Sequence, residues 1–279
     1  MNTVPFAPPP PADLTELGLI AGNGRYPFSL VAGARAAGVK RIVVAAFEGE
    51  TDPALASHVD EIEWLRVGQL GKMIKVFTSR KIAHAVMAGQ IAPSNLFNLR
   101  PDVKALILLA RLKERNAESI FGAIGDELAK AGVQLLSATS YMDEHLATKG
   151  VFAGPRLSRR EEEDVEFGKR IAKEISRLDI GQTVVVKSGT VLAVEGFDGT
   201  NATILRGGEL GKKDSVMVKV SKPNQDLRFD VPVIGPKTME VAVQARLRVI
   251  AVEAGLTIVL DRETVAAMAA KHKISVVGF

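Results

Sequence analysis

The sequence has no cysteine and few aromatic residues. The absence of cysteine excludes disulfide bonds and thiolate chemistry, and it is compatible with a reducing compartment. Phenylalanine, tyrosine and tryptophan together make up 5% of the 279 residues, so the side chains on which single-stranded nucleic acids stack are scarce. We therefore expect no nucleic-acid partner.

Long apolar runs and metal-binding motifs are also missing. The apolar run at 105–110 is far shorter than a membrane span, and the start of the chain lacks the basic and apolar segments of a signal peptide. The histidines are scattered, without a spacing such as H-E-x-x-H, so we expect no zinc site. These features predict a cytoplasmic protein that at most rests on a membrane surface.

The remaining composition is that of a soluble globular protein, with 47% hydrophobic and 24% charged residues. Its length gives room for two domains, each with a core of its own. The net charge of +4 favours an anionic partner, either a phosphate compound or an acidic membrane surface, and it is too small to choose between them.

The first half of the chain begins with the pattern of a phosphate-binding βα unit. An apolar run at 17–21 stops at Gly22-Asn23-Gly24, and a helix is expected over 28–37. Two glycines let the backbone approach a ligand, and the N–H groups at a helix start favour an anion. Pro27 stands where the dinucleotide fingerprint has its third glycine, so a tight turn without a ligand is the competing interpretation.

The same half predicts a parallel sheet covered by helices on both faces, because strand and helix patterns alternate along it. We expect a disordered proline-rich arm over 1–12 and a Rossmann-like domain over 13–140. Lys72 follows a glycine-led helix start and is a candidate phosphate contact, with a solvated lysine as the alternative. The expected strands lie at 17–21, 41–47, 63–65, 84–89 and 133–137, and the expected helices at 28–37, from 68, 102–111 and 117–130.

A linker and a connecting helix are predicted over 141–180. Ser158 and Glu161 form the pattern of a capping box, in which the side chain of each residue bonds to the backbone of the other. Apolar residues then recur at roughly helical spacing as far as Leu178. This pattern predicts a long amphipathic helix between the domains.

The C-terminal domain, 181–279, is predicted to be mixed α/β. β-branched runs at 183–187 and 190–194 flank a Ser-Gly turn, which is the pattern of a hairpin. Glu195 and Asp198 follow the second run, where carboxylates can point into a cleft, and solvent-facing loop acids are the alternative. The further expected elements are strands at 215–220, 257–260 and 275–278, and helices at 238–254 and 262–271.

The stretch from Lys219 to Thr238 carries the strongest functional pattern. Its three prolines predict a stiff, extended loop, and within it Asp226 stands between Lys222 and Arg228. This mixture of charges suits phosphoryl chemistry, in which a carboxylate holds Mg²⁺ or orients water while lysine and arginine clamp phosphate oxygens.

Residues 222–238 read Lys-Pro-x-Gln-Asp-x-Arg-Phe-Asp-x-Pro-x-x-Gly-x-x-Thr, which resembles the signature of the LpxI family. Further matches lie at 18–24, 68–71, 125–126, 179–182, 191–195 and 199–200. The resemblance implies two α/β domains and Mg²⁺-dependent hydrolysis of UDP-2,3-diacylglucosamine to UMP and 2,3-diacylglucosamine 1-phosphate. It also implies a homodimer that works in lipid A biosynthesis, peripheral on the cytoplasmic face of the inner membrane.

The resemblance also assigns residues to these roles. Asp226 matches the essential aspartate of the family, and Lys219, Lys222 and Arg228 would act beside it as phosphate clamps. The candidate magnesium ligands are Asp226, Glu195 and Asp198, the last two on the chemistry of their carboxylates alone. The candidate substrate contacts are Gly22, Asn23, Gly24, Lys72, Thr190, Lys219 and Gln225.

Two other functions stay open on the sequence. A nicotinamide-dependent oxidoreductase could be built on Gly22-Asn23-Gly24, but it leaves 219–238 without a role. A non-catalytic sensor of nucleotide sugars or lipid precursors would use the same residues as the enzyme. Turnover separates the sensor from the enzyme.

Overall fold

The computed structural model describes residues 7–91, 101–113, 117–223 and 225–279. Contacts divide the chain into two units. The N-terminal unit runs to Met142 and also takes in Asp226–Asp230, whereas the C-terminal unit comprises Asp143–Gln225 and Val231–Phe279. The chain therefore leaves the C-terminal unit after Gln225 and returns to it at Val231.

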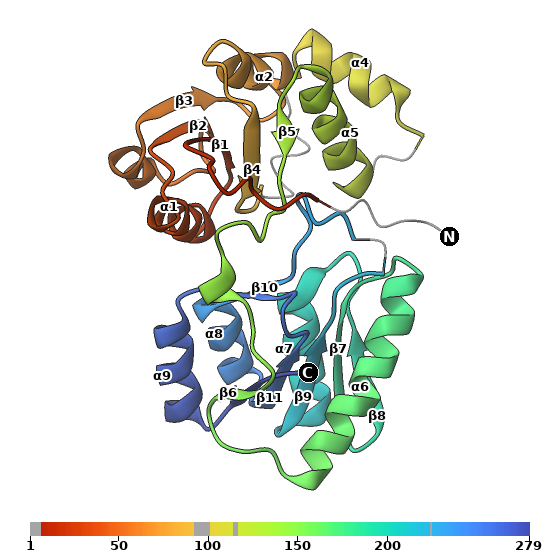
Figure 1. The fold of residues 1–279 in the computed structure, drawn as a ribbon. Helices are drawn as coiled ribbons and strands as arrows, with labels where there is room; N and C mark the ends of the chain where they lie inside the picture. Colours follow the sequence, from red (N-terminus) through yellow and green to blue (C-terminus); the bar gives the residue numbers. More distant parts are fainter. Residues whose placement is uncertain (1–6, 92–100, 114–116, 224) are drawn as a thin grey trace. The chain divides into compact units, whose positions relative to one another are not determined.

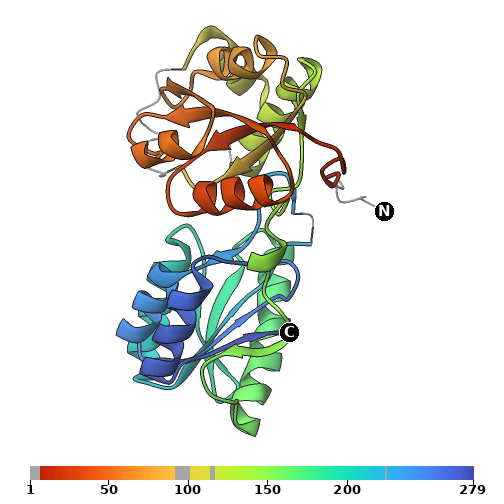
Figure 2. The same cartoon turned by 60° about the vertical axis from the view of Figure 1, so that its left-hand side comes forward.

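The N-terminal unit is built on a parallel sheet. Its strands are β1 (Glu16–Ala21), β2 (Arg41–Phe47), β3 (Glu61–Leu65), β4 (His84–Ala88) and β5 (Gln134–Leu135), in the order β3-β2-β1-β4-β5 (Figure 1). Its helices are α1 (Tyr26–Ala36), the 3-10 helix η1 (Pro53–His58), α2 (Leu70–Thr78), α4 (Val103–Arg111) and α5 (Ala117–Lys130). Val43 and Ala45 pack in one core with α2, α4 and α5, and α1 lies on the opposite face of the sheet (Figure 2).

The C-terminal unit has a mixed sheet. Its strands are β6 (Gly150–Ala153), β7 (Thr183–Lys187), β8 (Thr190–Val194), β9 (Ser215–Lys219), β10 (Val233–Ile234), β11 (Leu247–Val252), β12 (Ile258–Val259) and β13 (Ser275–Gly278). Its helices are the 3-10 helix η2 (Asp143–His145), α6 (Arg159–Arg177), α7 (Gly199–Gly211), α8 (Pro236–Gln244) and α9 (Arg262–His272). The main sheet has the order β13-β11-β9-β7-β8, with β7 antiparallel to both of its neighbours.

The side chains of β7 alternate between two cores, as expected for a strand buried on both faces. Val184 and Val186 pack with α6, while Val185 packs with α7 and α8 on the other face. The helices on the two faces of the sheet can be followed in Figure 2. Because β8 is antiparallel to β7, the carboxyl ends of β8, β9, β11 and β13 lie along one edge of the sheet. Side chains that follow those strands can therefore meet at that edge.

The predicted fold class is confirmed, and several expected details differ. The helix expected over 238–254 is wrong, because α8 ends at Gln244 and the chain turns at Arg246, with φ of 54°, into β11. The glycine loop expected after Glu195 runs directly into α7. The expected connecting helix is α6, which packs on β7 and β9 inside the C-terminal unit.

Two expectations concern the chain ends and the membrane. Residues 1–6 of the expected disordered arm lie outside the described residues, whereas Ala7 is buried and the C=O of Pro8 accepts a hydrogen bond of 3.5 Å from the N–H of Ser137. Disorder over the whole of 1–12 is therefore not observed. Within the described ranges, no helix combines the length and the apolar character that crossing a membrane requires.

Candidate active site

Asp226 is buried and lies beside Arg228 in the short segment Asp226–Asp230. The guanidinium donates hydrogen bonds from Nε to Oδ1 and from Nη2 to Oδ2 of Asp226, at 2.9 and 2.6 Å. The backbone N–H of Arg228 adds a bond of 3.0 Å to Oδ1. Such a bidentate pair fixes the plane of the carboxylate. Hydrogen bonding to Asp226 also raises the pKa of Arg228, so the guanidinium stays charged.

Contacts with α5 and with the chain after β5 hold this segment on the N-terminal unit. The C=O of Leu227 accepts a hydrogen bond of 2.7 Å from the N–H of Ala138. Nη1 of Arg228 lies 3.6 Å from Oδ1 of Asp126 on α5. Gly125 makes room for this contact, because a Cβ there would lie 3.0 Å from Nη1. The Asp226 carboxylate is thus positioned by residues far from it in the sequence.

The glycine turn after β1 packs against the turn after β4. The N–H groups of Gly22 and Asn23 donate to the C=O groups of Ala88 and Gln90, each at 2.8 Å. A Cβ on Gly22 would lie 2.5 Å from the carbonyl oxygen of Gln90, so only glycine allows this approach. Gly24 has φ of 88°, which also favours glycine. Both glycines therefore have a role in the fold.

The part of this turn that can bind an anion is the start of α1. The amide of Asn23 donates a hydrogen bond of 2.8 Å to the buried carboxylate of Glu50, so this side chain is engaged. Arg25, the N-cap residue of α1, makes no side-chain cap, and the first turn carries no acidic residue. The positive end of the helix dipole therefore favours an anion there. Lys72 is exposed on α2.

At the carboxyl edge of the C-terminal sheet, Lys219 and Glu195 are buried and joined through a threonine. Nζ of Lys219 donates to the hydroxyl of Thr200 at 2.9 Å and lies 3.3 Å from the hydroxyl of Thr183. The hydroxyl of Thr200 donates to Oε1 of Glu195 at 2.6 Å, and the N–H of Gln182 donates to Oε2 at 3.2 Å. The strand ends thus bring together two of the predicted site residues.

The charges of this network stabilise each other. Burial by itself would raise the pKa of the Glu195 carboxyl. The positive charge of Lys219 and the hydrogen bonds from Thr183, Thr200 and the Gln182 N–H outweigh burial, so the net pKa is lowered. Glu195 is therefore ionised at neutral pH and compensates the buried charge of Lys219.

The other predicted residues of this unit are placed apart. Asp198 pairs with Arg206, and the hydrogen bond between them is the main cause that lowers the pKa of Asp198. Thr190 is exposed at the start of β8, so it lies at the opposite end of that strand from Glu195. The structure therefore separates Thr190 from the predicted residues at the carboxyl edge.

Lys222 and Gln225 belong to the loop that leaves the carboxyl edge. Nζ of Lys222 pairs with the carboxylate of Asp179. Gln225 is buried, and its Oε1 accepts a hydrogen bond of 2.9 Å from the N–H of Lys222. This bond closes a turn directly before Asp226 and shapes the point at which the chain leaves the unit.

A second network, which the sequence did not predict, fixes the start of that loop. The Glu253 carboxylate, which follows β11, accepts hydrogen bonds of 2.8 Å from both the N–H of Ser221 and Nζ of Lys173. Lys173 also donates to the C=O of Ser221, at 3.2 Å. Asp126 and Asp179 were also not predicted as site residues. Both lie in segments that resemble the family, 125–126 and 179–182, but the sequence did not show that they pair with Arg228 and Lys222.

Among the described residues, no three acidic or histidine side chains come together as a ready metal site. The oxygens of Glu195 and Asp198 accept hydrogen bonds from the protein itself. Asp226 accepts its bonds from Arg228, a side chain that can turn to another anion. Asp198 is held in the same way by Arg206, so a phosphate could draw the arginine away from either aspartate, whereas Glu195 is held by Thr200 and the N–H of Gln182.

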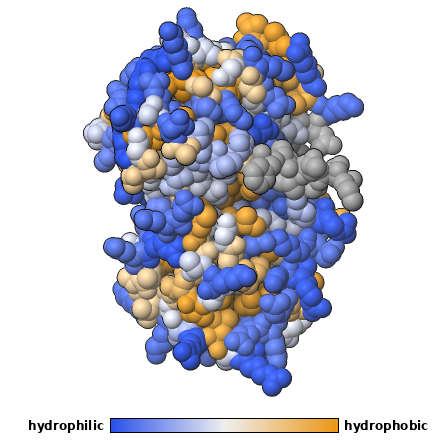
Figure 3. Space-filling view, in the orientation of Figure 1, coloured by the Kyte–Doolittle hydropathy of each residue, from blue (hydrophilic) through white to orange (hydrophobic). Residues whose placement is uncertain are grey.

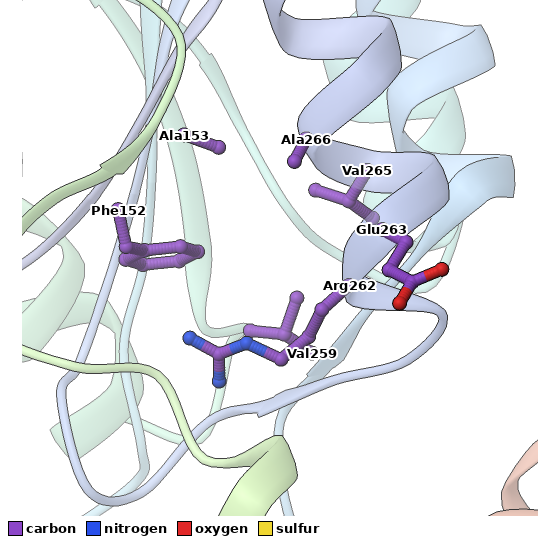
Figure 4. Close-up of a pocket in the computed structure, with 7 residues that line it drawn as sticks. All are labelled: Phe152, Ala153, Val259, Arg262, Glu263, Val265 and Ala266. Carbon is purple, nitrogen blue, oxygen red and sulfur yellow. The ribbon is translucent and has the colours of Figure 1, made fainter.

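A cavity of about 240 Å³ in the C-terminal unit contains none of the predicted residues. The guanidinium of Arg262 stacks over Phe152, 5.3 Å from the ring centroid, and donates to the C=O groups of Glu144 and Leu146. Arg262 is therefore engaged in the fold. The lining residues are Phe152, Ala153, Val259, Arg262, Glu263, Val265 and Ala266 (Figure 4).

Comparisons with known proteins cover almost the whole chain. The LpxI N-terminal domain matches residues 16–145, and the LpxI C-terminal domain matches residues 148–277. The UDP-2,3-diacylglucosamine pyrophosphatase LpxI of Caulobacter vibrioides is 32% identical over 276 residues, which cover 95% of this chain and 98% of that protein. Since both domains match and the similarity runs through the candidate site, the chain belongs to the LpxI family.

Proposed function

We propose that this protein hydrolyses the diphosphate of UDP-2,3-diacylglucosamine in lipid A biosynthesis, releasing UMP and 2,3-diacylglucosamine 1-phosphate. The observation that carries the proposal is the bidentate pair of Asp226 and Arg228 within the stretch that resembles the family signature. The similarity to a pyrophosphatase named for this substrate supports the substrate class.

In this reaction the oxygen of a water molecule bonds to one phosphorus, and the bond from that phosphorus to the bridging oxygen breaks. The bridging oxygen leaves with the other phosphate. Catalysis of such a step depends on positioning and on neutralising the charge of the phosphate oxygens. We assign the orientation of the water to Asp226, and charge neutralisation to Arg228 and Lys222.

Magnesium is the proposed cofactor. Mg²⁺ commonly takes one or two protein carboxylates and completes its shell with water and substrate phosphates, so a single carboxylate at Asp226 fits this ion. Glu195 and Asp198 stay as further candidate ligands, each of which would have to exchange a bond within the protein. When bound, the ion supplies positive charge to the diphosphate.

A homodimer on the cytoplasmic face of the inner membrane completes the proposal. The substrate class carries two acyl chains, so it resides in a lipid surface that the protein must reach. Family membership is the support for the dimer. Sedimentation velocity of the purified protein tests the dimer, which predicts about twice the 29.8 kDa mass of the chain.

The oxidoreductase alternative gains little from the glycine turn. The N–H groups of Gly22 and Asn23, which would approach a pyrophosphate in a dinucleotide site, already bond to the turn after β4. Anion binding at the start of α1 stays compatible with a UDP-sugar. We therefore keep Gly22, Asn23 and Gly24 as proposed substrate contacts through the helix start that they shape.

The decisive experiment measures UMP released from detergent-dispersed UDP-2,3-diacylglucosamine. We expect turnover that a chelator abolishes and added Mg²⁺ restores. A sensor would bind the substrate without releasing UMP. An oxidoreductase would bind NAD(H) tightly and would not respond to the UDP-sugar. Either of these two results would contradict the proposal.

A further inference from the structure

The outer face of α4 is apolar and exposed. Val103, Leu106 and Ile107 are 73%, 53% and 48% exposed and recur at helical spacing, and Ala110 continues the same face. Figure 3 shows orange, hydrophobic surface where Figure 1 labels α4. A helix on the surface of a globular protein normally carries polar residues on this side. The outer face of α4 therefore requires an explanation outside the fold.

The opposite side of the same helix is already used for packing. Ala105 and Leu108 are buried in the core that α4 shares with α2 and α5. The long helix α6 shows the ordinary pattern, since Val165 is buried while Arg159 and Glu163 are exposed. α4 is thus apolar on both sides, although packing explains only one of them.

Exposed basic side chains lie at one end of α4 and on the neighbouring helix α2. Arg111 and Lys113 are exposed at and just beyond the end of α4. The neighbouring helix α2 packs against α4 and exposes Lys72 and Lys75. An apolar face bordered by lysine and arginine is the composition of a helix that lies in a membrane interface.

Two of the described carboxylates beside α4 are engaged with the protein. Asp102, the N-cap residue of α4, accepts hydrogen bonds of 2.7 and 2.9 Å from the N–H groups of Gly71 and Ala105. Glu127 of α5 pairs with Lys104 of α4 at 3.1 Å. These two acids are therefore partly neutralised, and the charged side chains within α4 itself, Lys104 and Arg111, are both basic.

We propose that the outer face of α4 docks the protein on an anionic lipid bilayer. Val103, Leu106, Ile107 and Ala110 would enter the boundary between headgroups and acyl chains, and Arg111 would meet lipid phosphates. The Lys104–Glu127 pair joins α4 to α5, the helix that also contacts Arg228 through Asp126. The inference rests on the proposed function in one respect: a substrate with two acyl chains is located in a lipid surface, to which the enzyme must bind.

Co-sedimentation with vesicles tests this surface. We expect binding to vesicles that contain phosphatidylglycerol, with weaker binding at high salt and to vesicles of phosphatidylcholine alone. The double variant Leu106→Ser/Ile107→Ser should lower partitioning onto anionic vesicles by about tenfold. The matched control is Leu205→Ser/Leu210→Ser, which removes two leucines that are 36% and 59% exposed on α7, and it should bind like the wild type.

A second variant keeps the test valid if the first one misfolds by circular dichroism. Arg111→Gln/Lys113→Gln leaves the apolar residues in place, and it should weaken binding and flatten its salt dependence. Unchanged vesicle binding in a folded α4 variant would overturn the proposal. So would conversion of a dimer to a monomer with vesicle binding retained, because α4 would then be an interface between copies. Wild-type protein that releases UMP from detergent-dispersed substrate but ignores vesicles would refute the surface and the membrane location, and it would leave the proposed hydrolysis standing.

Discussion

The molecule contains two arrangements of opposite charges, and they differ in how the charges are held. Asp226 and Arg228 bond directly to each other within one short segment. Lys219 and Glu195 come from different strands, and the hydroxyl of Thr200 joins them. Asp226, Glu195 and Lys219 are all buried, whereas the Arg228 side chain is 20% exposed, so the cation of the first pair can turn toward an anion in solvent and that of the second cannot. A carboxylate beside a cation therefore suits the proposed reaction in one place and the stability of the fold in the other.

The sharpest test of this comparison is Asp226→Ala. Because Asp226 is assigned to the reacting water, UMP release should fall by about a thousandfold, while substrate binding changes little. Steady-state kinetics and isothermal titration calorimetry measure these quantities. Asp230→Ala, in the same segment, is the control and should stay within about threefold of the wild type. Turnover of Asp226→Ala near the wild-type rate would mean that the assignment is wrong.

Substitution of the partner should have the next largest effect. Arg228→Lys keeps the positive charge but loses the planar fork that holds both carboxylate oxygens of Asp226. We expect kcat to fall by about a hundredfold, with less change in KM. If Arg228→Lys matched the wild type in kcat, a point charge would be sufficient and the bidentate geometry would have no catalytic role.

The second pair should respond in stability rather than in chemistry. Lys219→Met leaves the buried Glu195 carboxylate without its nearby cation, so the free energy of unfolding should fall by about 3 kcal/mol. Adding Glu195→Gln to Lys219→Met should restore part of that loss. Urea denaturation measures both changes. A Lys219→Met protein that is fully stable but has lost phosphate affinity would show instead that Lys219 is a phosphate clamp, as the sequence predicts.

The smallest expected effect is a pH dependence. The pKa of Glu195 in the folded protein lies below its ordinary value of 4.5, so its ionisation stabilises the fold above that pH. This contribution is lost as the pH falls from about 4.5 through the folded pKa. The stability difference between the wild type and Glu195→Gln, measured by urea denaturation, should therefore shrink with acidification through that window. A difference that grows instead would contradict the sign of the pKa shift.

Local patterns in the sequence predicted local structure well. The hairpin strands at 183–187 and 190–194 and the last strand at 275–278 have the expected bounds, and the capping box of Ser158 and Glu161 is formed. Each of these depends on residues close together in the chain. The signature around Asp226 likewise identified a direct partner, Arg228, because the two residues are neighbours in sequence.

Features that depend on distant residues were not predicted. α7 was missed because Gly207 and Gly208 disfavour a helix locally, yet each is needed where the helix packs closely, against Val185 and Ala245. The helix expected over 238–254 overlooked β11, whose apolar residues are buried between two parallel neighbours. Asp226 was expected in the C-terminal domain, because no local pattern shows that the chain packs this segment against α5.

Asp226–Asp230 belong to the N-terminal unit, although the chain on both sides of them belongs to the C-terminal unit. This limits how the protein can be divided into two fragments. A fragment that ends at Met142 would lack the proposed catalytic aspartate, and a fragment that begins at Asp143 would carry it without the α5 surface that positions Arg228. Neither fragment alone is therefore expected to hydrolyse the substrate. Co-expression of the two fragments is therefore the arrangement in which split-protein complementation could recover hydrolysis.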